Sequence, residues 1–326
     1  MKNRMLGSAG FEVSEIGLGC WQLGADWGEA VAEDTAMNIL QAAWDSGVTV
    51  FDTADVYGAG RSETFIGKFI AQLDQKPRVI TKFGRGAVYP DGYTKDSMRA
   101  GIEASLERLD VDQLDLVQLH CIPTEELKKG DVFDWLRDLQ SEGLIAHFGA
   151  SVETVEEGKI AMTQEGLLSL QVIFNIFRQK VSRELLPIAA EKGVGIIVRL
   201  PLASGVLSGK FTKDTVFDAG DHRNFNRDGQ MFNVGETFAG VPFEDAVDLV
   251  DELKSDLPAG YAMADYANRW ILDHAAVSTI IPGASSPDQA RRNASVSALE
   301  PLSKDEHDKL QAFYDAKVAA KIRGAY

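Results

Sequence analysis

The sequence predicts an α/β fold of the (β/α)8, or TIM, barrel type, with an N-terminal β-hairpin cap and a long insert after the seventh strand. Three observations support this prediction: eight short apolar runs, amphipathic stretches between them, and no Pro-, Gly- or Ser-rich linker dividing the chain. Apolar runs without polar alternation are typical of parallel strands buried on both faces. A count of eight favours a closed barrel, so we expect one domain over residues 1–326.

The expected strands are separated by segments long enough for a helix. They cover residues 15–18, 48–51, 79–81, 114–119, 145–150, 170–174, 195–198 and 279–281. Helical periodicity is clearest over residues 32–46, 97–109, 132–141 and 183–192. In the second of these, Met98, Ile102 and Leu109 recur on one face while charged residues occupy the other, which indicates an amphipathic helix.

Two segments do not fit simple strand–helix units. The residues up to Val13, with Ala9-Gly10 as a turn signal, look like a hairpin that caps the bottom of the barrel. Residues 213–243 form a long polar insert after the seventh strand. A loop of this length is usually a functional lid or a disordered segment, and its place after the C-terminal end of a barrel strand favours a lid.

Composition and charge exclude several classes of function. The chain has 33 basic and 49 acidic residues and a formal net charge of −16, which repels nucleic acid and anionic membranes. Its sequence has no apolar run of the length of a membrane span and no signal-peptide pattern. Cys20 and Cys121 lie far apart and form no CxxC, which is typical of free thiols in a reducing compartment. We expect a cytoplasmic protein with a small-molecule substrate, no nucleic-acid or membrane partner, and an oligomeric state that the sequence leaves open.

Common nucleotide, hydrolase and metal motifs are missing from the sequence. Gly17-Leu18-Gly19 and Gly58-Ala59-Gly60 both lack the third glycine of GxGxxG. GxxxxGK[ST], HExxH and GxSxG do not occur, and the spacing of the five histidines does not suggest a metal cluster. We therefore expect no metal site.

Titratable residues end three neighbouring predicted strands. Asp52 follows the second strand with Tyr57 in the next loop, Lys82 follows the third strand, and His120 follows the fourth. The C-terminal ends of barrel strands share one face, so these side chains are expected to converge. A lysine would lower the high pKa of a tyrosine, an aspartate would keep the lysine ionised, and a histidine would position a carbonyl oxygen. Such a set can protonate an alkoxide, but a cofactor must supply the hydride.

Two further stretches form a specific motif. One runs from Met5-Leu6-Gly7 to Gly17-Leu18-Gly19-Cys20-Trp21, and the other is Phe51-Asp52-Thr53-Ala54-Asp55-Val56-Tyr57-Gly58 followed by Arg61-Ser62-Glu63. With Lys82 and His120, they resemble the aldo-keto reductase superfamily over nearly the full chain. The resemblance is to bacterial-type members, related to the potassium-channel β-subunit and aldose dehydrogenase branches. It implies that Tyr57 is the general acid/base, that Lys82 and Asp52 tune it, and that His120 orients the substrate carbonyl.

The resemblance also implies a nicotinamide cofactor. Ser151 and Gln171 would contact the carboxamide, residues 200–210 would cover the pyrophosphate, and residues 281–293 would hold the adenosine end. Arg199 stands where many members have an aromatic residue under the ring, and its charge is expected to disfavour the oxidised form. The full set of expected cofactor contacts is Gly19, Cys20, Trp21, Asp52, Ser151, Gln171, Arg199, Leu200, Leu202, Ser204, Gly205, Lys210, Arg223, Gly283, Ser285, Gln289, Arg292 and Asn293.

Lys210 and Arg223 add positive charge, so NADP(H) is favoured and NAD(H) stays possible. The substrate is expected to contact Trp21, Tyr57, His120 and Tyr89, with Trp27 as a further candidate for the wall. These residues predict an NAD(P)H-dependent oxidoreductase that reversibly reduces aldehydes or ketones to alcohols.

Three alternatives stay open. The first is a sugar or secondary-alcohol dehydrogenase that works in the oxidative direction. The second is a redox-sensing, cofactor-binding subunit with weak activity, resembling the potassium-channel β subunits. Those subunits can carry Asn at the position of His120, so the histidine favours an enzyme. The third is an aldolase-type barrel that uses Lys82 as a Schiff base.

Overall fold

The computed structural model describes residues 1–24 and 31–326. Its main sheet has eight parallel strands, and each strand pairs with the next in the chain. The strands are β3 (Leu18–Gly19), β4 (Val50–Asp52), β5 (Arg78–Phe83), β6 (Leu116–His120), β7 (Phe148–Ser151), β8 (Leu167–Ile173), β9 (Gly195–Arg199) and β10 (Val277–Ile280).

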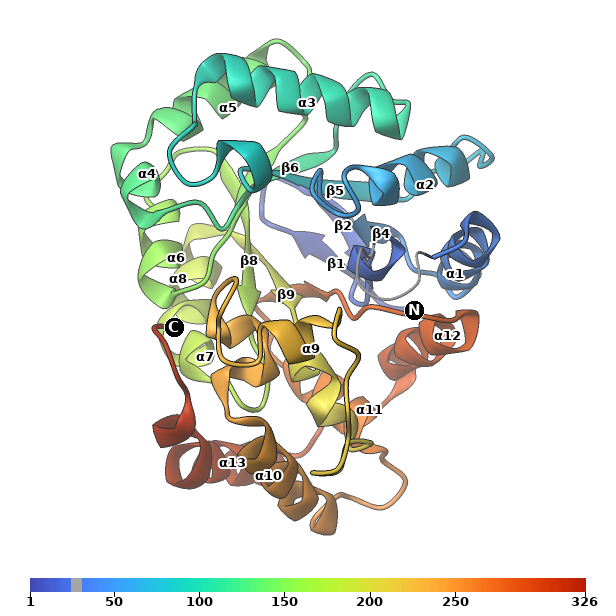
Figure 1. Cartoon of the computed structure of the whole chain (residues 1–326), viewed down its shortest axis with the longest axis vertical. Coiled ribbons are helices and arrows are strands. Elements are labelled where there is room, and N and C mark those ends of the chain that lie inside the picture. Colours follow the sequence, from blue (N-terminus) through green and yellow to red (C-terminus); the bar gives the residue numbers. More distant parts are fainter. Residues whose placement is uncertain (25–30) are drawn as a thin grey trace.

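Hydrogen bonds join the two ends of this sheet. The Gly17 N–H donates to the Ile280 carbonyl at 2.8 Å, and the Ile280 N–H donates to the Glu15 carbonyl at 3.0 Å. A further parallel bridge links Gly19 to Gly283. In Figure 1 the helices surround the strands. The predicted (β/α)8 fold is confirmed.

The helices follow the strands in the expected alternation. They are α1 (Glu33–Asp45), α2 (Arg61–Ile70), α3 (Lys95–Leu109), α4 (Thr124–Lys129), α5 (Asp131–Ser141), α6 (Val155–Ala161), α7 (Lys180–Glu184), α8 (Leu186–Lys192), α9 (His222–Phe225), α10 (Phe243–Ser255), α11 (Met263–Leu272), α12 (Pro287–Ser295) and α13 (Lys304–Phe313). None of the helices found in the described residues has both the length and the apolar character of a membrane span.

Local sequence explains where the helices begin and end. At α3, the Thr94 hydroxyl accepts the Ser97 N–H at 3.0 Å and the Ser97 hydroxyl accepts the Thr94 N–H at 2.9 Å, which forms a capping box. The expected single helix over residues 183–192 is two helices, α7 and α8. Pro187 stands in the first turn of α8, where its missing N–H costs no intrahelical bond, so the chain restarts a helix there.

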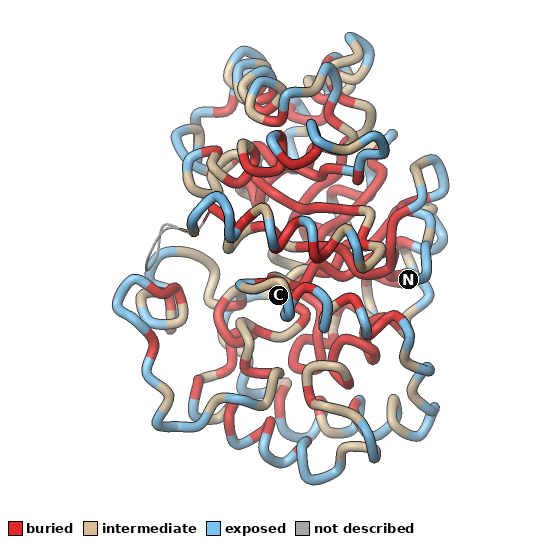
Figure 2. The backbone as a smooth tube through the Cα atoms, turned by 90° about the vertical axis from the view of Figure 1, so that its right-hand side faces the viewer, coloured by how far each residue is buried: buried red, intermediate tan, exposed pale blue. Residues whose placement is uncertain are grey.

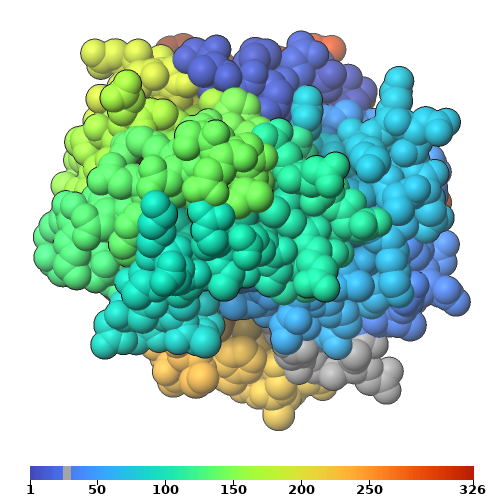
Figure 3. Space-filling model, turned by 90° about the horizontal axis from the view of Figure 1, so that it is seen from above, coloured from blue at the N-terminus to red at the C-terminus, as the bar shows by residue number. Residues whose placement is uncertain are grey.

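The hairpin of β1 (Asn3–Leu6) and β2 (Phe11–Ser14) closes the bottom of the barrel, as predicted. Its buried Leu6 and Val13 form an apolar cluster with residues at the starts of the strands, including Val50 and Leu116. Figure 2 shows buried residues gathered along the central strands. In Figure 3 the dark blue N-terminal residues and the gold atoms of the insert lie at opposite edges. The hairpin and the insert therefore occupy opposite sides of the molecule.

Candidate active site

A cavity of about 480 Å³ lies at the C-terminal ends of the strands. Its wall combines strand ends from β3 to β9, the segment after β10, and side chains of the 213–243 insert. In Figure 1 the part of the insert that carries α9 lies across the lower half of the ring of strands. The cavity occupies the end of the barrel where the sequence places the converging titratable residues.

The structure brings the four expected side chains together at this end. The Lys82 Nζ lies 2.6 Å from Asp52 Oδ1 and 3.3 Å from the Tyr57 hydroxyl oxygen. It also donates to the Thr53 carbonyl at 2.7 Å. The His120 ring lies 5.8 Å from the Tyr57 ring, nearly perpendicular to it. A buried ammonium group thus connects a carboxylate to a phenol beside an imidazole.

The residues that follow Tyr57 hold its loop in place. The Ser62 hydroxyl accepts from Thr53 Oγ1 at 2.9 Å and donates to the Cys20 carbonyl at 2.9 Å. The buried Glu63 carboxylate accepts from Arg108 Nε at 2.6 Å and from Thr81 Oγ1 at 2.5 Å. Ser62 and Glu63 of the motif therefore attach the start of α2 to the strand ends.

Gln171 contacts two other polar side chains of the site. Its Nε2 donates to Asp52 Oδ2 at 2.6 Å and to Gln118 Oε1 at 2.9 Å. Both oxygens of the Asp52 carboxylate are therefore engaged, one by Lys82 and one by Gln171. This fixes the orientation of the carboxylate that in turn holds Lys82.

Burial dominates the electrostatics of the site. It raises the pKa of the Tyr57 phenol above its ordinary value, and Lys82 opposes this rise without cancelling it. Burial likewise raises the pKa of Asp52 against the effect of Lys82. For Lys82, burial acts to lower the pKa, but Asp52 and Tyr57 outweigh it and the pKa is raised. Lys82 acts on the pKa of Tyr57 in the predicted direction, and the net shift is upward because desolvation is the larger effect.

His120 is held in its neutral form. Burial lowers its pKa well below the ordinary value, and the positive charges of Arg85, Lys82 and Arg199 lower it further. Its Nδ1 is buried and has no hydrogen-bond partner among the described residues. A neutral imidazole of this kind can donate a hydrogen bond to a ligand oxygen without carrying a charge.

Most of the expected cofactor contacts line the cavity. Those that do so are Gly19, Trp21, Asp52, Ser151, Gln171, Arg199, Leu200, Leu202, Ser204, Gly205, Arg223, Gly283, Ser285 and Gln289. The other expected contacts lie within the described residues but do not line the cavity. They are Cys20, Lys210, Arg292 and Asn293. Asn293 still supports the site, because its Nδ2 donates to the Gly283 carbonyl at 3.1 Å.

The expected substrate contacts divide in the same way. Trp21, Tyr57 and His120 line the cavity. Tyr89 is half exposed and, within the described part of the chain, is not part of the lining. Trp27 lies outside the described residues.

One end of the cavity suits a phosphate-bearing ligand. After β9, the backbone of Leu200, Ala203, Ser204 and Gly205 takes positive φ angles of 53°, 47°, 56° and 92°. Small residues in this conformation leave the backbone open to a ligand, as in concave anion sites, and the N–H groups of Ala203 and Gly205 close the turn by donating to the Leu200 and Leu202 carbonyls at 3.0 and 2.9 Å. A Cβ built on Gly205 would lie 3.8 Å from Arg223 Nη1, so a guanidinium borders the turn. A backbone that a ligand can approach closely and a nearby guanidinium suit a pyrophosphate, and the residues present therefore fit a dinucleotide.

The sequence analysis missed several residues of the wall. The insert contributes Phe225, Phe232 and Glu236, and the segment after β5 contributes Arg85. Arg85 follows Lys82 closely, so the rule that strand ends face the site could have identified it. The insert residues carry no comparable signal, because their positions depend on how a long loop packs.

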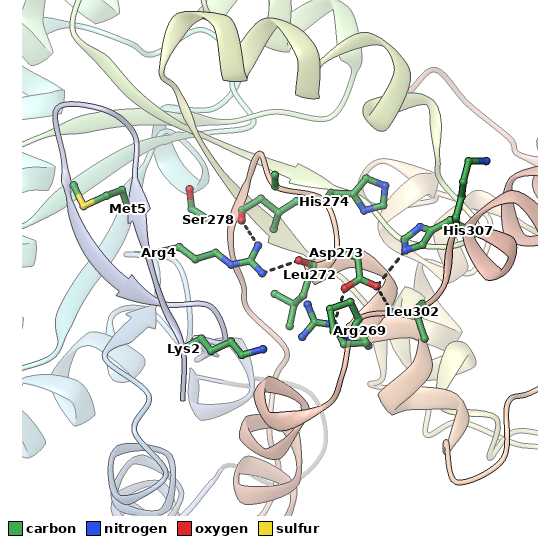
Figure 4. A pocket seen from close by; sticks show the side chains of 14 residues that line it. Lys2, Arg4, Met5, Arg269, Leu272, Asp273, His274, Ser278, Leu302 and His307 are labelled. Atoms are coloured by element: carbon green, nitrogen blue, oxygen red, sulfur yellow. Dashed lines mark hydrogen bonds and ion pairs between the residues drawn. The ribbon is translucent and has the colours of Figure 1, made fainter.

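A larger cavity of about 890 Å³ lies at the opposite end of the barrel (Figure 4). Its charged groups contact one another. Asp273 accepts from Arg269 Nε at 2.9 Å and from the Leu302 N–H at 2.9 Å, and lies 3.1 Å from His307 Nε2. Arg4 Nη2 donates to the Leu272 carbonyl at 2.7 Å. These bonds tie the hairpin and the C-terminal segment to the barrel.

The fold and the first cavity together define a (β/α)8 barrel with an acid–base site at the C-terminal ends of its strands. The model of the aldo/keto reductase family matches residues 15–315. The chain therefore belongs to the aldo/keto reductase family, which supports an oxidoreductase acting on carbonyl or CH–OH groups.

Two curated relatives are similar to nearly the whole chain. The chain is 28% identical to the aldo-keto reductase YhdN of Bacillus subtilis over 94% of its own length and 92% of that protein. It is 30% identical to a probable voltage-gated potassium channel subunit beta of Oryza sativa, over 97% of this chain and 98% of the other.

Two solved structures share the architecture over nearly the full length. The glycerol dehydrogenase AKR11B4 of Gluconobacter oxydans has a TM-score of 0.79 and 26% identity, covering 99% of this chain and 98% of the other. An aldo-keto reductase of Klebsiella pneumoniae in complex with NADPH has a TM-score of 0.72 and 24% identity, covering 96% and 95%, and shares the fold.

Proposed function

We propose that this protein is an NADP(H)-dependent carbonyl reductase that reversibly converts aldehydes or ketones to alcohols. The observation that carries the proposal is the chain of contacts from Asp52 through Lys82 to the Tyr57 hydroxyl, with a neutral His120 beside it. We further propose that residues 1–326 act as one barrel domain and that residues 213–243 serve as its lid.

The cofactor would occupy the length of the cavity. Ser151 and Gln171 would lie beside the nicotinamide, the turn over residues 200–205 with Arg223 would hold the phosphates, and Ser285 would lie at the adenosine end. The NADPH complex of the Klebsiella relative supports NADP(H) as the cofactor. When bound, the reduced nicotinamide supplies the hydride that reaches the carbonyl carbon.

The protein residues handle the oxygen of the substrate. The carbonyl oxygen accepts hydrogen bonds from the Tyr57 hydroxyl and from the neutral His120 imidazole. As negative charge develops on this oxygen, the phenol proton moves from Tyr57 to it. The phenolate left behind is stabilised by the ammonium of Lys82, which Asp52 keeps charged and in position.

The raised pKa of Tyr57 suits the reductive direction. The phenol keeps its proton at neutral pH and can therefore donate it. In the oxidative direction, the same residue must first lose the proton to accept one from an alcohol. The name of the Gluconobacter relative, a glycerol dehydrogenase, supports oxidation as the alternative direction, with the same residues in reversed roles.

A second candidate function is a cofactor-binding, redox-sensing subunit with little turnover. Its support is the similarity to a probable potassium channel subunit beta over nearly the whole chain. The two functions share the cofactor site and differ in turnover.

Binding and turnover should be measured separately on the full chain. Fluorescence titration with NADPH and NADH should give tighter binding of NADPH. NADPH oxidation over a panel of aldehydes and ketones should then give multiple turnovers with at least one class of substrate. Tight NADPH binding without turnover on any panel member, in either direction, would favour the sensing subunit. Failure to bind either cofactor would contradict both functions.

A further inference from the structure

We propose that Arg199, together with its counter-charge Glu236 in the insert, makes the protein bind the reduced nicotinamide cofactor more tightly than the oxidised one. This inference rests on the proposed function. It assigns the pair a specific task, which is to set the ratio of the two affinities and thereby the ease with which oxidised cofactor leaves.

Arg199 lies where the reacting end of a cofactor must be. It ends β9 and lines the same cavity as Tyr57 and His120. Its Nη2 lies 3.4 Å from the sulfur of Cys121, which follows His120, and 3.4 Å from the carbonyl of Val152. A ring that delivers hydride to a carbon between Tyr57 and His120 would share this cavity with the guanidinium.

The backbone fixes Arg199 at this place. The next residue, Leu200, has a φ of 53°, so the chain turns sharply as the strand ends. Asn175 Nδ2 donates to the Leu200 carbonyl at 3.0 Å and holds the turn. The guanidinium is mostly buried, and its Nε has no hydrogen-bond partner among the described residues. The positive charge is therefore positioned before any ligand binds.

Glu236 moderates this charge. Its carboxylate lies 2.8 Å from Arg85 Nη2 and 3.5 Å from Arg199 Nη1, so one acid serves two guanidinium groups. Burial opposes its ionisation, but Arg85 and Arg199 outweigh burial and lower the pKa of Glu236 to about 2. Glu153, 3.0 Å from Arg85, has a pKa raised by burial and by Glu236. Glu236 thus lies nearer to Arg85, and the Arg199 guanidinium has only the longer contact of 3.5 Å with this carboxylate.

The same cluster argues against a metal ion at this point. Cys121, Glu153 and Glu236 each place a ligand atom within 4.8 Å of the others. The Arg199 guanidinium contacts Cys121 and Glu236, and the Arg85 guanidinium contacts Glu153 and Glu236. The cation that balances these acids is therefore supplied by arginine.

The positive charge of Arg199 distinguishes the two forms of the cofactor. The oxidised nicotinamide ring carries a positive charge and the reduced ring is neutral, while the phosphates are the same in both. A fixed cation beside the ring therefore repels the oxidised form alone. Removing the charge of Arg199 should tighten NADP⁺ relative to NADPH, whereas removing the charge of Glu236 should act in the opposite direction.

The test is equilibrium binding of NADPH and NADP⁺ to the unaltered chain and to three variants. Arg199→Gln should lower the ratio of Kd for NADP⁺ to Kd for NADPH by about 3- to 30-fold. Glu236→Gln, which keeps the shape of the side chain, should raise the ratio by about threefold or more. Arg199→Lys keeps the charge and should hold the ratio within about threefold of the unaltered chain.

Arg223→Gln is the matched control, because Arg223 lines the cavity beside the turn proposed to hold the phosphates. It should weaken both forms by the same factor and leave the ratio unchanged. If Arg199→Gln and Glu236→Gln also weaken both forms equally, the pair only holds the insert and the inference is overturned. If the unaltered chain binds neither form, the proposed function itself fails, so the two failures are distinguishable.

Discussion

The two ends of the barrel use buried charges in different ways. At the bottom, the buried Glu15 accepts from Arg4 Nε at 2.9 Å and from the Ser297 hydroxyl at 2.8 Å, and Arg4 also donates to the Leu272 carbonyl. At the top, the Tyr57 hydroxyl has one contact of 3.3 Å with Lys82, and His120 Nδ1 has no partner among the described residues. At the bottom, protein groups use the donors of Arg4, and the buried Arg269 Nη1, which has no hydrogen bond within the described residues, lies 3.9 Å from the Glu15 carboxylate. At the top, His120 Nδ1 has no charged protein partner in the described part of the chain and can serve a ligand.

This difference shows that neither exposed charge nor cavity size identifies the reactive site. The larger cavity lies at the bottom and is lined by several basic residues, including Lys2 and Lys304. The Arg4 donors that border it are already used to attach the hairpin to the barrel (Figure 4). In the smaller cavity at the top, His120 Nδ1 and Arg199 Nε, which are unpartnered among the described residues, lie together with the acid–base residues, which is the arrangement expected of a site that binds and reacts.

The largest expected effect on stability comes from breaking the bottom cluster. Arg4→Met removes the nearer of the two cationic partners that the described residues give the buried Glu15, leaves Arg269 at 3.9 Å, and leaves the Leu272 and Val277 carbonyls without their donor. The free energy of unfolding should fall by about 3–5 kcal/mol, because a buried carboxylate loses its closest counter-charge and two carbonyls lose their donor. Urea unfolding followed by circular dichroism measures this, and kcat/KM of the folded fraction should stay unchanged.

Arg183→Met is the control for this change. Arg183 forms an exposed ion pair with Asp315 at 2.7 Å, so its removal should cost no more than about 1 kcal/mol. If Arg4→Met were as mild as Arg183→Met, or if it reduced kcat/KM of folded protein, the two ends would not be separable in the way described.

A smaller effect is expected at the active site, where the rates of reduction and oxidation should depend differently on pH. Because the pKa of Tyr57 is raised, the phenol persists well above neutral pH. Reduction, which needs the phenol, should therefore be insensitive to pH around neutrality. Oxidation, which needs the phenolate, should become about tenfold faster per pH unit as the pH rises toward that pKa. Initial rates in both directions across a pH series test this, and an oxidation rate that falls as pH rises would contradict it.

The meeting of Asp52, Lys82 and His120 could be predicted from sequence, because all three end neighbouring parallel strands and such ends share one face. The hairpin was predictable for a similar local reason, since a turn signal separates two short apolar runs. These predictions depend on chain order and strand periodicity alone.

The remaining features depend on tertiary packing. Glu236 meets Arg85 and Arg199 only because the insert folds back over the strand ends, and no periodicity records that contact. The net pKa shift of Tyr57 depends on how completely the site excludes water, which the identity of its neighbour Lys82 does not reveal. Pro187 indicates that the helix expected over residues 183–192 is divided, but the helical periodicity of the surrounding residues favoured a single helix.

The central claim is that Tyr57 transfers the proton at the top of the barrel, and Tyr57→Phe tests it most directly. The change removes one oxygen atom and leaves the ring in place. The measurement is kcat/KM for an aldehyde reduced by the unaltered chain, together with the Kd for NADPH. We expect a loss of about 10²- to 10⁴-fold in kcat/KM with little change in Kd. Near-normal kcat/KM in a folded variant that still binds NADPH would contradict it.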